Sequence, residues 1–199
     1  MLKDKVIVVT GGSDGIGKAL VSQLLQEDAR VATCGRSQEK LNALITSHNN
    51  QHLLALPCDV SDEGEAREFI EKTIAHYGKI DILINNAGIS MRSPFNEVSV
   101  ETMRKVMAIN FFGAINCTRY AIQSIIDNQG SIVGISSIAG NRGLPGRSGY
   151  SASKFALQGW MEALRSELLD TGVNVLWVSP GFTKSNVRKA ALTKTTSAQ

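Results

Sequence analysis

Six short apolar segments alternate with segments of helical periodicity along this 199-residue chain, and this alternation constrains the fold most. Several apolar segments are continuous rather than alternating, as expected of strands that helices cover on both faces. The order predicts a doubly wound parallel α/β sheet flanked by helices. The expected strands are residues 6–10, 30–34, 53–56, 80–84, 131–135 and 173–178, and the expected helices are residues 16–27, 38–46, 63–77, 100–126 and 150–169.

Composition and charge exclude several other classes of protein. With 43% hydrophobic and 20% charged residues, the chain can bury one sizeable core, and we expect residues 1–199 to form a single domain. The 21 basic and 18 acidic residues give a net charge of +3, too small for a nucleic-acid footprint. Neither a run of about eighteen apolar residues nor a signal peptide is present, so we expect no membrane span and a cytoplasmic location.

The cysteines and two of the histidines carry no recognisable site. Cys34, Cys58 and Cys117 are odd in number and widely spaced, which argues against a disulfide framework and fits a reducing compartment. We expect each to be a small buried side chain. His48 and His52 are four residues apart, but no cysteine or carboxylate completes a metal-ligand set. We therefore expect both to be exposed loop residues, and no metal site.

Ligands of parallel α/β sheets bind at the carboxyl ends of the strands, so the turn after the first strand is informative. It reads TGGSDGIGK from Thr10 to Lys18. Glycines at such a turn let backbone N–H groups approach a phosphate at the start of the next helix. From Gly12 the spacing fits a Walker A motif, but Ala19 stands where a hydroxyl should hold Mg²⁺, which argues against an NTPase. The G-x-G-x-x-G dinucleotide spacing is not present either.

A second chemical feature is Tyr150, four residues before Lys154 at the start of the last predicted helix. Helical spacing places the two side chains on one side of that helix. A phenol is a poor acid or base at neutral pH unless its phenolate is stabilised, and an ammonium one turn away in a dry site helps to do so. The alternative is a surface Tyr–Lys pair, and the other strand ends decide between the two.

Several strand-end motifs together resemble the classical short-chain dehydrogenase/reductase family. They are the first turn as T-G-x-x-x-G-x-G, the pair Asp59–Val60, the run NNAG that ends at Gly88, Ser137 thirteen residues before Tyr150, and the turn Pro180–Gly181. The resemblance covers nearly all of the chain and implies a Rossmann-like fold that binds NAD(P). Family members usually continue with a substrate lid, another helix and a seventh strand, so we expect the last helix and strand to be missing here.

The resemblance also implies the roles of individual residues. Tyr150 is the general acid/base, Lys154 assists it and holds the nicotinamide ribose, Ser137 polarises the substrate oxygen, and Asn110 holds a water in a proton relay. Asp59 meets the adenine amino group. From the residues alone, Asp59 is equally suited to cap a helix, as are Ser61 and Asp62, and Asn110 to satisfy a neighbouring carbonyl. The implied cofactor-binding residues are Gly11, Ser13, Gly15, Ile16, Gly17, Arg36, Asp59, Val60, Asn86, Ala87, Gly88, Tyr150, Lys154, Pro180, Gly181 and Thr183.

The end of the second strand bears on the choice of cofactor. Enzymes that prefer NAD place a carboxylate here for the ribose 2′-hydroxyl, and Gly35 occupies that position. The next residue, Arg36, suits a 2′-phosphate because a guanidinium binds phosphate in bidentate fashion. We therefore expect NADP(H) rather than NAD(H), against the alternative that Arg36 is a solvated loop charge.

These features predict an NADP(H)-dependent oxidoreductase that interconverts a carbonyl compound and an alcohol. One alternative is a catalytically silent NADP(H)-binding sensor or scaffold, and another is a racemase or dehydratase that uses the cofactor transiently. The expected partners are a small-molecule substrate and further copies of the chain, as a dimer or tetramer, with no nucleic acid. Ser136 is expected to be structural, and apolar residues are expected to line the substrate pocket: Met91, Phe95, Leu144 and Pro145.

Overall fold

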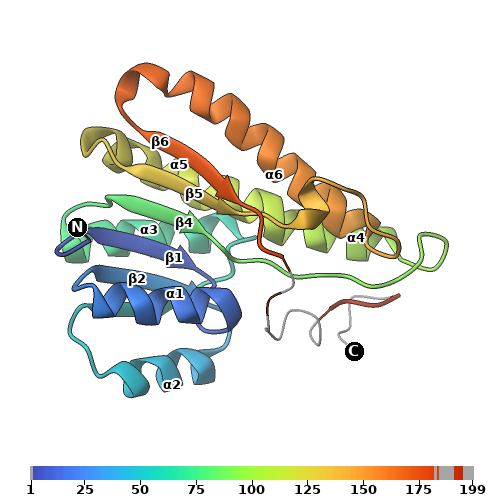
Figure 1. Ribbon diagram of the computed structural model, residues 1–199. Coiled ribbons are helices and arrows are strands. Elements are labelled where there is room, and N and C mark those ends of the chain that lie inside the picture. Colours follow the sequence, from blue (N-terminus) through green and yellow to red (C-terminus); the bar gives the residue numbers. More distant parts are fainter. Residues whose placement is uncertain (1, 182, 184–190, 195–199) are drawn as a thin grey trace.

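The computed structural model describes residues 2–181, 183 and 191–194. In this part of the chain, six strands form one sheet in the order β3-β2-β1-β4-β5-β6 (Figure 1). All neighbouring strands are parallel. The strands are β1 (Val6–Thr10), β2 (Arg30–Gly35), β3 (Leu53–Pro57), β4 (Ile82–Asn85), β5 (Ser131–Ile135) and β6 (Asn174–Val178). The helices are α1 (Gly15–Gln26), α2 (Gln38–His48), α3 (Glu63–Tyr77), α4 (Val100–Met107), α5 (Gly113–Asp127) and α6 (Ser148–Glu167), with a π-helical segment η1 (Ala108–Phe112) and the 3₁₀ turns η2 (Ile138–Gly140) and η3 (Leu169–Thr171).

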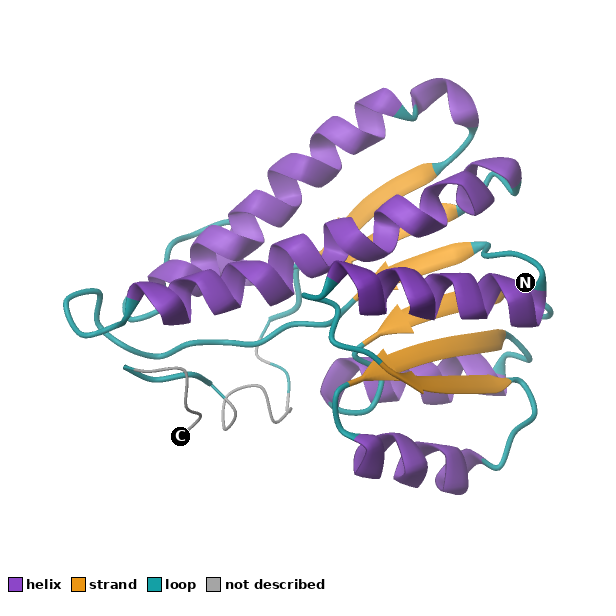
Figure 2. Ribbon diagram, turned by 180° about the vertical axis from the view of Figure 1, so that it is seen from behind, coloured by secondary structure: helices purple, strands orange, loops and turns teal. Residues whose placement is uncertain are grey.

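Helices cover both faces of the sheet, as the continuous apolar strands predict. Val8 and Ile132 belong to a buried cluster with α3, α5 and α6, whereas Ile7 and Val9 belong to a cluster with α1 and α2. Figure 2 shows the face that α3 and α5 cover. Side chains alternate between the two faces of a strand, so neighbouring residues of β1 enter different clusters. The predicted doubly wound fold is confirmed.

Polar side chains determine where four of the helices begin. Each accepts a hydrogen bond from a backbone N–H of the first turn, which otherwise has no partner within the helix. For α3 this residue is Asp62, whereas Asp59 accepts bonds from the N–H and hydroxyl of Ser61 instead. The four capping residues are Asp14, Ser37, Asp62 and Ser99.

The long helix predicted over residues 100–126 is divided into α4, η1 and α5. In η1 the N–H of Gly113 donates to the carbonyl of Ala108, five residues earlier rather than four. Sequence periodicity does not predict the extra residue in this turn, because Ile109, Asn110 and Gly113 keep helical spacing and are all buried. The other predicted elements are found with ends shifted by at most two residues.

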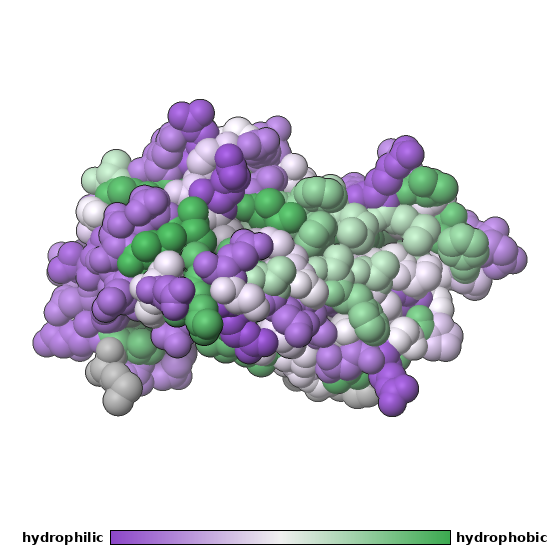
Figure 3. Space-filling model, turned by 90° about the horizontal axis from the view of Figure 1, so that it is seen from above, coloured by the Kyte–Doolittle hydropathy of each residue, from purple (hydrophilic) through white to green (hydrophobic). Residues whose placement is uncertain are grey.

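Within the residues that the structure describes, β6 is the outermost strand on its side of the sheet. Leu176 and Val178 on this strand are 42% and 45% exposed. Figure 3 views the molecule from the side of α6 and β6, where hydrophobic and polar surface are interspersed. None of the described helices combines the length and the apolar character that crossing a bilayer requires.

The expectation for the cysteines is confirmed, and that for the histidines is wrong in part. Cys34, Cys58 and Cys117 are free thiols and buried. His48 is the last residue of α2 and is half-buried, with its ring hydrogen-bonded to the Ser22 hydroxyl at 3.0 Å. His52 is also half-buried rather than exposed. The contact between α1 and α2 that holds His48 joins residues 26 positions apart, so no local sequence pattern predicts it.

Candidate active site

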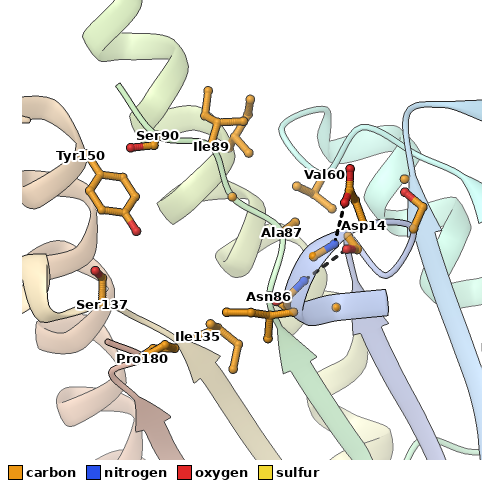
Figure 4. Close-up of a pocket in the computed structure, with 18 of the residues that line it drawn as sticks. Asp14, Val60, Asn86, Ala87, Ile89, Ser90, Ile135, Ser137, Tyr150 and Pro180 are labelled. Atoms are coloured by element: carbon orange, nitrogen blue, oxygen red, sulfur yellow. Dashed lines mark hydrogen bonds between the residues drawn. The ribbon is translucent and has the colours of Figure 1, made fainter. Parts of the chain in front are cut away.

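A cavity of about 550 Å³ opens at the carboxyl ends of the strands. Figure 4 shows side chains from several strand ends around it. All sixteen predicted cofactor-binding residues line this cavity, and so does Ser137. Of the predicted site residues, Asn110 alone is outside the lining. The structure therefore brings together motifs that are up to 172 residues apart in the sequence, from Gly11 to Thr183.

The glycine turn after β1 packs so tightly that it has no room for a side chain at Gly11 or Gly17. Gly11 has a φ of +69°, and a Cβ there would lie 2.9 Å from the Ala87 Cα. A Cβ on Gly17 would lie 2.4 Å from the Gly11 carbonyl oxygen. These glycines keep the backbone free of side chains where α1 begins, as a bound pyrophosphate requires. This cradle at a helix N-terminus fits the nicotinamide dinucleotide that the sequence predicts.

Hydrogen bonds fasten this turn to the end of β4. The Thr10 hydroxyl accepts from the N–H groups of Asn86 and Ala87, each at 3.0 Å. In return, the Asn86 amide donates to the carbonyls of Thr10 and Gly11, at 2.8 and 3.2 Å. The Asn86 side chain of the NNAG run thus positions the glycine turn, and residues 86–88 of the run line the cavity.

At the end of the cavity formed by the turns after β1, β2 and β3, two acidic side chains pair with two basic ones. Asp14 caps α1 and pairs with Lys40, with 2.5 Å between Oδ2 and Nζ. Arg36 is 3.9 Å from Asp59 and is 55% exposed. The sequence predicts Arg36 and Asp59 in this region but not Asp14 and Lys40. An aspartate directly before the helix was an available capping signal for Asp14, whereas the position of Lys40 on α2 depends on the folded structure.

At the other end of the cavity, the Lys154 ammonium is buried. Its side chain comes from α6, and Nζ donates to the Ile135 carbonyl at 2.7 Å. Nζ also lies 5.9 Å from the centroid of the Tyr150 ring. Burial lowers the pKa of Lys154 to about 8, because a desolvated ammonium loses its hydration. No ion pair in the described part of the chain includes Lys154.

Tyr150 and Ser137 face each other across the cavity. Figure 4 shows the Tyr150 hydroxyl and the Ser137 side chain directed into the same space. Ser137 precedes η2, and its hydroxyl accepts from the Ala139 N–H at 3.2 Å, which leaves the O–H proton available to a ligand. Ser136 is 4% exposed, and its hydroxyl accepts from Gln158 at 2.8 Å. This contact agrees with the structural role expected for Ser136.

Asn110 lies behind the cavity wall in η1, with its side chain fully engaged. Its Oδ1 accepts from the Ile89 N–H at 2.8 Å, and its Nδ2 donates to the Ile89 carbonyl and the Ser153 hydroxyl, both at 2.9 Å. The side chain therefore satisfies neighbouring backbone, as one interpretation of the sequence held. It joins the segment after β4 to the first turns of α6, which carry Tyr150 and Lys154.

The remaining predicted residues are placed in part. Pro180, Gly181 and Thr183 line the cavity, whereas Phe182 between them lies outside the described residues. Of the four apolar residues expected in the substrate pocket, only Leu144 lines the cavity. Met91 is buried beside Val106 and Leu192, and Phe95 is 74% exposed. Loop residues carry no periodic pattern, so their hydrophobicity did not reveal which way they point.

Comparison with known proteins agrees with this geometry. The family model described as short chain dehydrogenase matches residues 5–196. The chain belongs to the short-chain dehydrogenase/reductase family. Dehydrogenase/reductase SDR family member 7B of Rattus norvegicus is 37% identical over 96% of this chain and 62% of the relative. A Drosophila melanogaster SDR family protein 7-like is 34% identical over 96% of this chain and 61% of its own length.

A solved structure extends the comparison. A short-chain dehydrogenase from Streptomyces avermitilis superimposes with a TM-score of 0.89 and 30% identity, over 97% of this chain and 71% of that one. The chain spans less than two thirds of the length of the two curated relatives, from Rattus norvegicus and Drosophila melanogaster. Membership of this oxidoreductase family implies an NAD(P) cofactor, and the predicted family and Rossmann-like fold are confirmed.

The buried ammonium predicts a specific dependence of stability on pH. The pKa of Lys154 falls from 10.5 to about 8 on folding, so the unfolded chain binds more protons between these pH values. Stability therefore rises with pH in this window, and burying the charged lysine costs stability below it. Replacing Lys154 by methionine removes that cost but also a hydrogen bond to Ile135. We expect a gain of roughly 2 kcal/mol in the free energy of unfolding at pH 7.

Urea unfolding of the ligand-free protein at pH 7 and pH 10 measures this effect. Most of the gain from Lys154→Met is expected to disappear at pH 10, where the wild-type lysine is neutral. Lys18→Met, at an exposed position on α1, is the matched control and should show no such difference. A destabilised Lys154→Met variant at pH 7, or the same effect at both pH values, would contradict the assignment.

Proposed function

We propose that the chain catalyses the NADP(H)-dependent interconversion of a ketone or aldehyde and an alcohol. The observation that carries the proposal is the buried Lys154 ammonium beside Tyr150, whose hydroxyl faces Ser137 in the cavity that holds the glycine turn. In this arrangement Tyr150 can transfer a proton, the charge of Lys154 can assist that transfer, and Ser137 can donate a hydrogen bond to the substrate oxygen. A surface Tyr–Lys pair needs no buried ammonium.

The cofactor, when bound, supplies or accepts the hydride. Glycines of the first turn and Lys154, which line the same cavity as Tyr150, would hold it. In reduction, the Tyr150 hydroxyl donates its proton to the oxygen of the substrate as negative charge develops there, and in oxidation it accepts that proton. Ser137 donates a hydrogen bond to the same oxygen. Lys154 provides positive charge next to the resulting phenolate, in a site whose low polarity strengthens the interaction.

Asn110 acts as a positioning residue in this scheme. Its bonds to both backbone groups of Ile89 and to the Ser153 hydroxyl fix one cavity wall against α6. Ser153 in turn donates to the Tyr150 carbonyl at 2.7 Å, so the network reaches the backbone of the acid/base residue. We propose that the proton path to solvent runs along this wall.

The preference for NADP(H) rests on the end of β2. A Cβ on Gly35 would lie 2.8 Å from the Ser13 hydroxyl, so a carboxylate at this position would need space that Ser13 occupies. Arg36 lines the cavity with an exposed guanidinium and a loose 3.9 Å contact to Asp59. Such a guanidinium is available to a 2′-phosphate at little energetic cost.

The first prediction from this proposal concerns Arg36. We expect Arg36→Gln to weaken NADPH binding by about 10- to 100-fold and to leave NADH binding nearly unchanged, because only NADPH carries the 2′-phosphate. Fluorescence titration gives both dissociation constants without a known substrate. Arg30→Gln, at the opposite end of the same strand, is the control. Tighter binding of NADH than NADPH by the wild-type protein would overturn the proposed preference.

The second prediction concerns Tyr150. We expect Tyr150→Phe to lower kcat by roughly 10²- to 10⁴-fold, because it removes the proton donor but keeps the ring. NADPH oxidation is followed with a panel of ketones and aldehydes, and NADPH affinity is expected to stay near the wild-type value. Tyr120→Phe, whose hydroxyl binds Glu63 on the outer side of α5, should keep full activity. Substantial turnover by Tyr150→Phe would refute the assignment.

The same assays separate the alternative functions. A sensor or scaffold would bind NADPH tightly and turn over no compound of the panel. A racemase or dehydratase would change the substrate without net oxidation of NADPH, which product analysis detects. The uncompensated ammonium beside Tyr150 favours the oxidoreductase, because it lowers stability and a protein that only binds the cofactor gains nothing from it.

We also propose that copies of the chain associate as a dimer or tetramer through the surfaces of η1 and α6. Phe112 on η1 and Phe155 on α6 are 51% and 48% exposed, and Phe111 packs edge-to-face against both Phe112 and Trp160. Exposed aromatic side chains of this kind are typical of an interface. We further propose a single domain over residues 1–199 and a cytoplasmic location, which three buried free thiols favour.

Analytical ultracentrifugation tests the association. The wild-type protein is expected to sediment as a dimer or tetramer, and the double variant Phe112→Ser, Phe155→Ser to dissociate more readily. Phe95→Ser is the matched control, because Phe95 is 74% exposed in a loop away from this cluster. A wild-type monomer at high concentration would rule the proposal out.

A further inference from the structure

The charges that line the cavity are distributed unevenly. Six charged side chains line the cavity. At the end formed by the turns after β1, β2 and β3, Asp14 pairs with Lys40 and Asp59 with Arg36. The other two are Lys154 and Arg147. Neither forms an ion pair with any residue in the described ranges 2–181, 183 and 191–194. The half of the cavity that contains Tyr150 therefore carries two positive charges that no carboxylate neutralises.

Arg147 is fixed on the cavity wall. Its backbone N–H donates to Leu144, and its carbonyl accepts from the Ser151 N–H at 2.8 Å, which places it immediately before the first turn of α6. Its guanidinium donates through one nitrogen to the Ser90 hydroxyl at 2.7 Å. Ser90 is 1% exposed, and Figure 4 shows it on the same side of the cavity as the Tyr150 ring.

The contact with Ser90 does not by itself explain an arginine. A guanidinium has five N–H donors, and this bond uses one of them. A neutral amide side chain would supply the same bond without placing a full charge in a half-buried position. Apolar side chains also line the cavity: Leu144, whose carbonyl accepts from the Arg147 N–H, Ile89, which directly precedes Ser90, and Ile138. Such surroundings strengthen the attraction between the guanidinium and an anion that enters the cavity.

We propose that Arg147 binds an anionic group of the substrate. The substrate is then an oxo acid or hydroxy acid, with an apolar body against Ile89, Ile138 and Leu144 and a carboxylate on Arg147. Arg147 directly precedes α6 and Tyr150 lies in its first turn, and both line the same cavity, so one substrate can place its carboxylate on Arg147 and its carbonyl near Tyr150. This inference rests on the proposed oxidoreductase function, and it names the class of substrate for that reaction.

The test compares each acid with its uncharged ester. NADPH oxidation is measured with 4-phenyl-2-oxobutanoate and 4-oxo-4-phenylbutanoate and with their methyl esters, which differ in the spacing between carbonyl and carboxylate. We expect the wild-type protein to prefer at least one acid over its ester. We expect Arg147→Met to lower kcat/KM for that acid by about 10- to 100-fold, with the ester changed little. Arg147→Lys keeps the charge and is expected to fall between the two.

Arg142→Gln is the matched control, since Arg142 is an exposed arginine in the same connection that does not line the cavity. An equal loss for acid and ester in Arg147→Met would show that Arg147 only supports the wall through Ser90 and would overturn the proposal. A wild-type preference for both esters would overturn it too. Thermal unfolding of each variant establishes that the comparison uses folded protein.

A binding measurement separates this inference from the proposed function. Calorimetry titrates 4-phenylbutanoate, which has no reducible carbonyl, and its uncharged amide into the protein–NADPH complex. Binding of the carboxylate that Arg147→Met abolishes and Arg142→Gln preserves supports the inference even where no compound is turned over, in which case the oxidoreductase proposal alone fails. Equal binding of carboxylate and amide by the wild-type protein overturns the inference even where ketones are reduced.

Discussion

The bond between the Lys154 ammonium and the Ile135 carbonyl connects the stability of this protein to its chemistry. A charged group is held in a dry site by a carbonyl at the end of β5, and no carboxylate of the described residues forms an ion pair with it. Since burial lowers the pKa of Lys154, this charge opposes folding at neutral pH, and the rest of the structure must offset the cost. The two apolar clusters on either face of the sheet supply that stability, and they leave the carboxyl edge free for polar groups.

The carboxyl edge divides into two electrostatic environments. At the end formed by β2 and β3, charges are paired and partly exposed, so an anion that binds there replaces an existing partner. At the end formed by β5 and α6, Lys154 and Arg147 have no ion-pair partner among the residues that the structure describes and are more deeply buried, so a ligand changes the electrostatic balance more strongly. Binding is thus supported along the whole cavity, whereas groups able to act on a substrate are concentrated around Tyr150. One sheet edge holds both because parallel strands all end there.

Much of this was accessible from the sequence, for identifiable reasons. Continuous apolar strands and helical periodicity are local properties, and they gave the doubly wound fold. The motifs at the strand ends converge because the topology brings them together, so the sequence predicts without any distance that Tyr150, Lys154 and Ser137 line one cavity. Lys40 and Arg147 were not predicted, because the position of each depends on a hydrogen-bond partner distant in the chain. The partner of Lys40 is Asp14, and that of Arg147 is Ser90. The half-buried His48 was mispredicted because its partner Ser22 lies on another helix.

The π-helical turn that contains Asn110 and the helix α5 that follows it pack against different parts of the molecule. A turn closed by a bond over five residues instead of four holds one residue more than a regular helical turn. A helix lacking that residue would give α5 the same rotational phase, and Cys117, Ala121 and Ile125 would still point into the core. The π-helical turn is therefore not needed to direct these three side chains into the core, and it holds the Asn110 side chain against both backbone groups of Ile89. The long helix thus packs into the core along α5 and supports the cavity wall at one turn.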